Sequence, residues 1–110
     1  MPRDYKVYLE DIFSSIQKIE KYLKDTSFDN FRKNDIKIDA VVRNLEIIGE
    51  AAKNIPVDAK KIYTKIDWKK IAGLRDILIH QYFGIDLDIL WDIIQNKLPE
   101  LKKNIRHILK

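Results

Sequence analysis

The stretch DIKIDAVVRNLEIIGEAAKNIP, residues 35–56, carries the clearest fold signal in the chain. Its apolar residues recur at intervals of three and four, which is the period of one face of an α-helix. They are Ile36, Ile38, Val41, Val42, Leu45, Ile47, Ile48, Ala51 and Ala52. The segment ends at Pro56, because a residue that precedes proline is pushed out of the helical region. We therefore expect a long helix from about residue 35 to residue 54.

The same periodicity on both sides predicts further helices with short connections. They cover residues 4–24, 58–64, 67–82 and 87–109, with a helical turn at 28–32. We expect an all-α fold, an up-and-down bundle of four main helices plus short helices, in a single domain of residues 1–110.

Capping residues mark the expected helix starts. They are Asp4, Ser27, Asp67 and either Asp86 or Asp88. Gly84 supplies a stop for the helix that begins at Asp67. Pro99 should kink the last helix, since proline lacks the backbone N–H that a helical hydrogen bond needs.

The composition excludes several kinds of site. The chain has no cysteine, which rules out disulfides and thiolate metal ligands and favours a reducing cytoplasm. Two histidines without a carboxylate cluster argue against a transition-metal site, so we expect neither a metal nor another cofactor. No stretch approaches the ~18 apolar residues that span a membrane, and the acidic first twenty residues do not fit a signal peptide. We expect a soluble cytoplasmic protein.

The net charge of +4 is unevenly distributed. Residues 57–70 carry five lysines against two aspartates, and residues 97–110 carry five basic residues against one glutamate. These two segments flank residues 74–84 and could attract phosphates. On charge alone, lysines that keep helix surfaces hydrated remain the simpler interpretation.

The flanked stretch, LRDILIHQYFG at residues 74–84, combines residues that suit phosphate chemistry. Arg75 falls within the apolar sector of the expected helix, close to Tyr82. His80 lies about 140° from Arg75 on an ideal helix, and Asp76 shares its side. An inward arginine needs a partner. The simplest is a salt bridge to Glu46 or Glu50; the other is a phosphate.

Arg75 and His80 together supply what metal-free cleavage of a phosphodiester requires. A histidine with a pKa near its reference value of about 6.5 can give and take protons, and an arginine can hold a phosphate with paired hydrogen bonds. One ideal helix does not aim both groups at one point. Either the helix ends before His80 and the chain turns, or two copies of the protein share one site.

Residues 35–54 give a weaker indication. Arg43, Glu46 and Glu50 fall along one stripe of the helix and could line a cleft that orients Arg75, or form a surface ladder. Gly49 costs roughly 1 kcal/mol inside a helix. This cost favours close approach by another helix, with a dimer partner as one candidate.

Three blocks of the sequence resemble HepT toxins of the HEPN superfamily of small helical nucleases. Arg75–Tyr82 matches the Arg-x4-His-x-Tyr signature of that family. The blocks RNLEIIGEAAKNIP (residues 43–56) and DWKKIAGLRDILIHQYFGIDLDILWDIIQNKLPEL (residues 67–101) are similar in order and spacing. With the opening helix, the resemblance covers almost the whole chain.

The resemblance implies a helical homodimer and a metal-independent endoribonuclease, with the two motifs facing each other at the interface. Arg75 and His80 would be the catalytic pair, with Asp76 in a supporting role. The family's partner is MntA, a minimal nucleotidyltransferase antitoxin that transfers AMP from ATP to the motif tyrosine, here Tyr82. Without the resemblance, a buried ring that hydrogen-bonds to a helix end is the simpler interpretation of Tyr82.

Two other functions stay open at this point. The chain could be a non-catalytic module that holds a nucleotide phosphate with Arg75 and His80. It could also be a helical subunit that docks a nucleotidyltransferase.

Overall fold

Amphipathic segments form helices throughout the computed structural model, which describes residues 4–80 and 86–110; the side chains of Ile77, Ile79 and His80 lie outside that description. The elements are α1 (Tyr5–Tyr22), α2 (Phe28–Arg32), α3 (Asp35–Lys53), α4 (Val57–Ile62), α5 (Trp68–His80), α6 (Leu87–Asp92), a π-helical segment (Ile93–Lys97) and α7 (Leu98–Leu109). No strand occurs within the described ranges. The all-α fold is confirmed.

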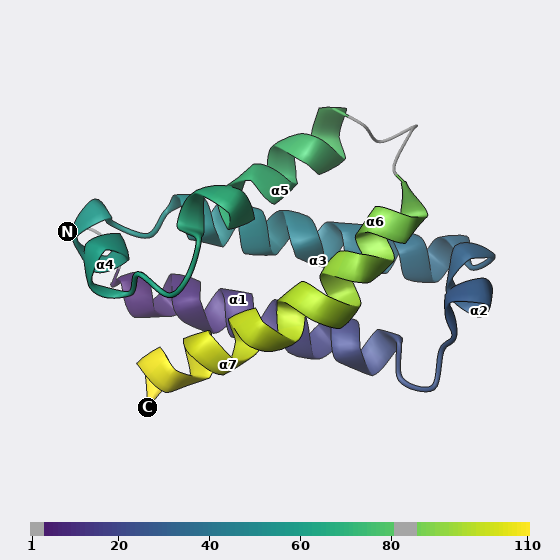
Figure 1. Ribbon diagram of the computed structural model, residues 1–110, viewed down its shortest axis with the longest axis horizontal. Helices are drawn as coiled ribbons and strands as arrows, with labels where there is room; N and C mark the ends of the chain where they lie inside the picture. The colour runs from purple at the N-terminus through teal and green to yellow at the C-terminus, as the bar shows by residue number, and fades with distance from the viewer. Residues whose placement is uncertain (1–3, 81–85) are drawn as a thin grey trace.

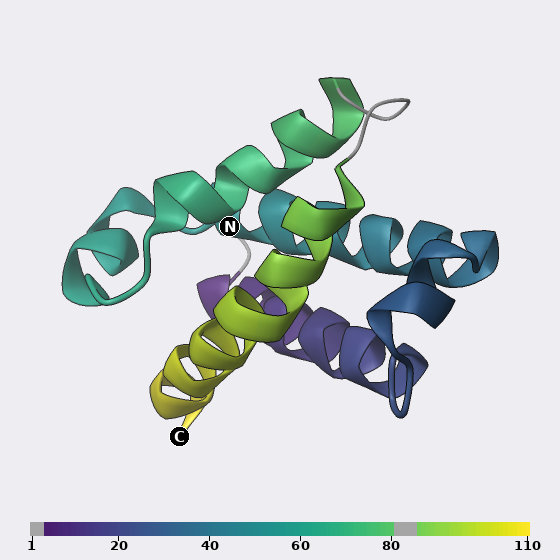
Figure 2. The same ribbon diagram turned by 45° about the vertical axis from the view of Figure 1, so that its right-hand side comes forward.

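The main helices run alternately in opposite directions (Figure 1). Helices α1 and α3 lie antiparallel, α5 crosses back over α3, and α6–α7 returns towards the start of α1. Helix α5 packs chiefly on α3, whereas α7 packs on α1. The turned view shows that α5 diverges from α7 towards the start of α5 (Figure 2).

The expected capping residues begin the helices. Each side-chain oxygen accepts a backbone N–H two or three residues later, at 2.9–3.2 Å, which satisfies donors that lack a partner in the first helical turn. The capping residues are Asp4, Ser27, Asp67 and Asp86. Asp86, and not Asp88, therefore caps α6.

The last helix contains a π-helical segment directly ahead of Pro99, a feature that the sequence does not predict. Residues 87–109 form one continuous run, widened over Ile93–Lys97, where the backbone N–H of Leu98 donates to the carbonyl of Ile93, five residues back. Pro99 then sits in the first turn of α7, where a missing N–H costs little. Proline and π-helical turns are both places where helices bend, so the kink expected at Pro99 stays a prediction.

The core lies between α1, α2, α3 and α7. Its largest fully buried side chains are Phe31, Leu9, Ile12, Ile16, Ile19, Leu45, Ile48, Ile105 and Val41. Trp91 packs against Phe28 and Phe31, with ring centroids 5.6 and 5.2 Å apart, and so joins α6 to α2. Within the described residues, no helix is both long and apolar enough to cross a membrane.

Candidate active site

The start of α5, which precedes Arg75 and His80 along the helix, is anchored to the rest of the bundle. Trp68 is 5% exposed, and its indole N–H donates to the carbonyl of Tyr63 at 3.0 Å. Tyr63 also hydrogen-bonds to Tyr5 of α1, and this contact raises the pKa of the Tyr5 hydroxyl above its usual value. Because its first turn is fixed to the bundle, α5 presents later residues at defined positions along α3.

Gly49 sets the distance between α3 and α5. A Cβ atom at this position would lie 3.0 Å from the backbone nitrogen of Arg75 and 3.1 Å from its Cβ. The close approach that Gly49 predicts is therefore confirmed, and the approaching helix is α5 of the same chain. A glycine on α3 thus fixes the position of Arg75.

Replacing Gly49 with leucine should therefore destabilise the fold. We expect the free energy of unfolding to fall by about 1–3 kcal/mol, because a side chain here would push into the backbone of α5. Gly73 on α5 is the matched control, since a Cβ there meets no described atom within 4 Å. Gly73→Leu should match or exceed wild-type stability, because leucine favours the helix. Urea unfolding of both variants checks this, and equal destabilisation would contradict it.

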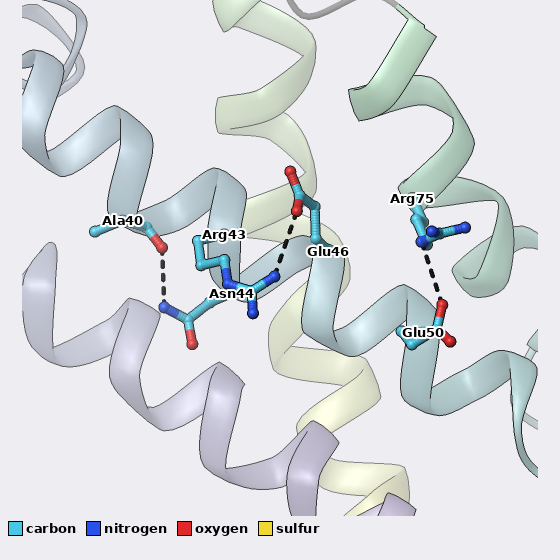
Figure 3. Close-up of polar contacts among 6 residues, drawn as sticks. All are labelled: Ala40, Arg43, Asn44, Glu46, Glu50 and Arg75. Carbon is cyan, nitrogen blue, oxygen red and sulfur yellow. Dashed lines mark hydrogen bonds and ion pairs between the residues drawn. The ribbon is translucent and has the colours of Figure 1, made fainter.

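Arg75 is held at one edge by Glu50 (Figure 3). Its Nε lies 3.2 Å from Oε2 of Glu50, and the two side chains are 40% and 51% exposed. Of the two carboxylates that the sequence offers, Glu50 is the partner, while Glu46 pairs with Arg43 at 3.6 Å. An ion pair this exposed contributes little stability. Its effect is to orient the guanidinium group, which stays accessible to an anion.

A depression of ≈ 380 Å³ lies on one side of Arg75. It brings together Arg43, Glu46 and Glu50, the residues that the sequence suggests as cleft-lining, with Arg75 itself. Asp11 of α1 also lines it, so acidic residues outnumber basic ones, three to two. The structure thus places the three α3 residues beside Arg75, in surroundings that do not favour an anion.

A second, larger groove of ≈ 920 Å³ shares only Arg75 with this depression. Asp76, the suggested supporting residue, is exposed and lines this groove with Arg75. Lysines surround both residues, and they come from the end of α3, from α4 and from the start of α5. Sequence reasoning assigns Lys53 no part here, because it lies outside the basic segment of residues 57–70.

Helix α5 remains helical through His80. The suggestion that the helix ends before His80 and turns is therefore wrong. On a regular helix Arg75 and His80 are separated by about 7.5 Å along the axis and diverge around it. The His80 side chain and the whole of Tyr82, with residues 81–85, lie outside the described residues. In the part of the chain that the structure describes, no group of three His, Cys, Asp or Glu residues could hold a metal ion.

Comparison with known proteins gives a family match for residues 12–108, to the family described as Ribonuclease HepT-like. The chain belongs to this HepT-like ribonuclease family. The match includes α3, α5 and the groove between them, so the resemblance on which the sequence interpretation rests is confirmed. The enzyme class predicted from the sequence, a ribonuclease, is confirmed at the level of the family.

Relatives that are 43–44% identical to this chain carry ribonuclease names. A Thermococcus cleftensis protein named "Probable ribonuclease HepT" is 43% identical over 110 residues, all of both chains. A Caldanaerobacter subterraneus protein named "Putative RNase" is 44% identical over 103 residues, 94% of this chain and 92% of that one.

A third relative, from Methanocaldococcus jannaschii, is 44% identical over 110 residues, and its name joins a gamma-glutamylcyclotransferase to an RNase. This chain spans half the length of that protein. No solved structure matches the chain significantly.

Proposed function

We propose that this HepT-like chain is a metal-independent endoribonuclease and the toxin of a toxin–antitoxin pair. The observation that carries the proposal is the placement of Arg75. Gly49 fixes its backbone, Glu50 orients its guanidinium, and its half-exposed side chain faces a basic groove. A histidine follows five residues later on the same helix. We place this activity in the cytoplasm, where RNA and ATP are available.

The chemistry follows from these residue types. The 2′-hydroxyl of RNA attacks the adjacent phosphorus and gives its proton to His80 acting as a general base. The bond from phosphorus to the 5′-oxygen breaks, and that oxygen takes a proton from a protonated His80. Arg75 stabilises the extra negative charge on the phosphorane-like transition state. The products are a 2′,3′-cyclic phosphate and a 5′-hydroxyl.

A homodimer brings the two groups together in this proposal. Because α5 continues through His80, Arg75 and His80 of one chain diverge. A two-fold axis between two α5 helices would place the Arg75 of one protomer near the partner's His80. The dimer then holds two such pairings, each of one Arg75 with one His80 of the other protomer.

RNA incubated with the protein in EDTA tests this function. We expect cleavage that does not need a metal, products with 2′,3′-cyclic phosphate ends, and no cleavage at a position where a single 2′-deoxynucleotide replaces the ribonucleotide. Intact RNA would contradict the proposal and favour a non-catalytic phosphate-binding module. Cleavage of the 2′-deoxy position would contradict the proposed nucleophile.

We further propose that an MntA-type nucleotidyltransferase silences the site by modifying Tyr82. The tyrosine oxygen would attack the α-phosphorus of ATP, form a phosphodiester to AMP and release pyrophosphate. Tyr82 follows His80 by two residues, so the added phosphate would compete with RNA for Arg75. The modification would therefore block the anion site.

Intact mass after incubation with ATP and an MntA-type nucleotidyltransferase tests the modification. We expect AMP-sized increments on wild type, none on Tyr82→Phe, and loss of RNA cleavage in proportion to the modified fraction. Tyr63→Phe is the control, because Tyr63 precedes α5 and should leave the increments unchanged. Increments that persist in Tyr82→Phe would identify another acceptor.

A further inference from the structure

The groove beside Arg75 is strongly basic. Its lining has five basic residues, Arg75 with Lys53, Lys60, Lys65 and Lys69, and two acidic ones, Asp67 and Asp76. The smaller depression that also borders Arg75 is lined by more acidic than basic residues. An anionic strand that reaches Arg75 is therefore attracted along the groove and disfavoured in the depression.

The lysines of the groove come from three helices and the connection between two of them. Lys53 ends α3, Lys60 lies on α4, Lys65 lies between α4 and α5, and Lys69 lies in the first turn of α5. The fold gathers charges that are separated in sequence, and none of these lysines has an ion-pair partner among the described residues. Their charge is available to a ligand.

The second basic segment, at residues 97–110, is arranged differently. Lys102 on α7 pairs with Glu20 of α1 at 2.7 Å and lies over the ring of Phe13. Arg106 lies over the same ring, 5.5 Å from its centroid. These cations join α7 to α1 and do not line the groove beside Arg75.

Gly73, which lines the groove, independently indicates that the groove holds a ligand. It lies in the interior of α5, where glycine is unfavourable, yet a Cβ there would meet no described atom within 4 Å. Gly49 has an internal reason to be small, because α5 contacts it. At Gly73 the open side is the groove itself, so the space that a side chain would fill is space for a ligand.

We propose that this groove, lined by Lys53, Lys60, Lys65, Lys69 and Gly73, binds the sugar-phosphate backbone of the RNA strand next to the cleaved phosphate. The inference rests on the proposed ribonuclease function and adds the path of the substrate. The lysines contact phosphates, and Gly73 lets the strand approach the helix backbone. Recognition of this kind depends on phosphates and not on base sequence.

Binding of a fluorescently labelled 2′-O-methyl oligoribonucleotide tests the groove separately from catalysis, since this probe lacks the attacking hydroxyl. Anisotropy titrations between about 50 and 200 mM salt give Kd and its salt dependence. For Lys65→Gln/Lys69→Gln we expect binding weaker on the order of tenfold and a log–log salt slope reduced by about 1.4, from two lost phosphate contacts.

Lys61→Gln/Lys70→Gln is the matched control. It removes the same charge from the same basic segment, and both lysines are exposed but do not line the groove. We expect Kd and salt slope close to wild type. Equal weakening of RNA binding in the two double variants would mean that only net charge matters, and would overturn the inference. Wild-type binding by Lys65→Gln/Lys69→Gln would overturn it as well.

Gly73→Leu adds a readout that a structural role would not give. We expect wild-type or higher thermal stability, together with RNA binding weakened by a factor similar to that of the lysine variant. Unchanged binding would contradict the approach of the strand to Gly73. If wild type binds the probe through the groove but leaves ordinary RNA intact, the nuclease proposal fails and the groove stands. If RNA is cut but the groove variants bind normally, the groove inference alone fails.

Discussion

Arg75→Ala is expected to slow RNA cleavage by about 10²–10³-fold, the loss typical when one group that stabilises transition-state charge is removed. The fold should survive. Arg75 is 40% exposed, and its ion pair with Glu50 is open to solvent. Exposed pairs of this kind contribute about 0–1 kcal/mol. Cleavage rates under single-turnover conditions, with urea unfolding alongside, separate lost chemistry from lost stability.

Two further variants show which property of Arg75 matters. Arg75→Lys keeps the charge but lacks the planar fork that holds two phosphate oxygens, so we expect an intermediate rate. Glu50→Gln removes the charge of the partner and leaves Arg75 in place, so we expect less than about tenfold loss. An Arg75→Ala protein that is folded and cuts RNA at the wild-type rate would exclude the proposed role.

His80→Ala is expected to lower the cleavage rate by about 10²–10⁴-fold, since it removes the group that moves both protons. The chain contains its own control, because its other histidine, His107, is exposed on α7. His107→Ala should cleave RNA at the wild-type rate. The assay is the same metal-free cleavage in EDTA. Equal losses in both variants, or none in His80→Ala, would be inconsistent with the mechanism.

The helices could be predicted because their signals are local. Apolar spacing and the side chains Asp4, Ser27 and Asp67 act within a few residues of the backbone that they organise. The close approach of another helix at Gly49 could also be predicted, since a glycine inside a helix implies a close neighbour. Sequence alone did not identify that neighbour as α5, because helix pairing depends on contacts between distant segments.

The site was only partly readable. The inward position of Arg75 predicted an anionic partner, either a carboxylate of Glu46 or Glu50 or a phosphate. Of the two carboxylates, only the packing of α5 on α3 selects Glu50. The basic groove was harder still to predict from the sequence, since it combines Lys53 and Lys60 from two helices with the start of a third. The π-helical turn before Pro99 also had no sequence signal, because proline predicts a disturbance of the helix but not its form.

The central claim is that Arg75 and His80, which diverge on one α5, act on one phosphate across a two-fold axis. An equal mixture of the Arg75→Ala and His80→Ala proteins, allowed to exchange subunits, tests it most directly. Half of the dimers would be mixed, and each would contain one intact pairing of Arg75 with the partner's His80. We therefore predict recovery of about one quarter of wild-type cleavage from two nearly inactive proteins. A mixture no more active than its components would contradict the shared site.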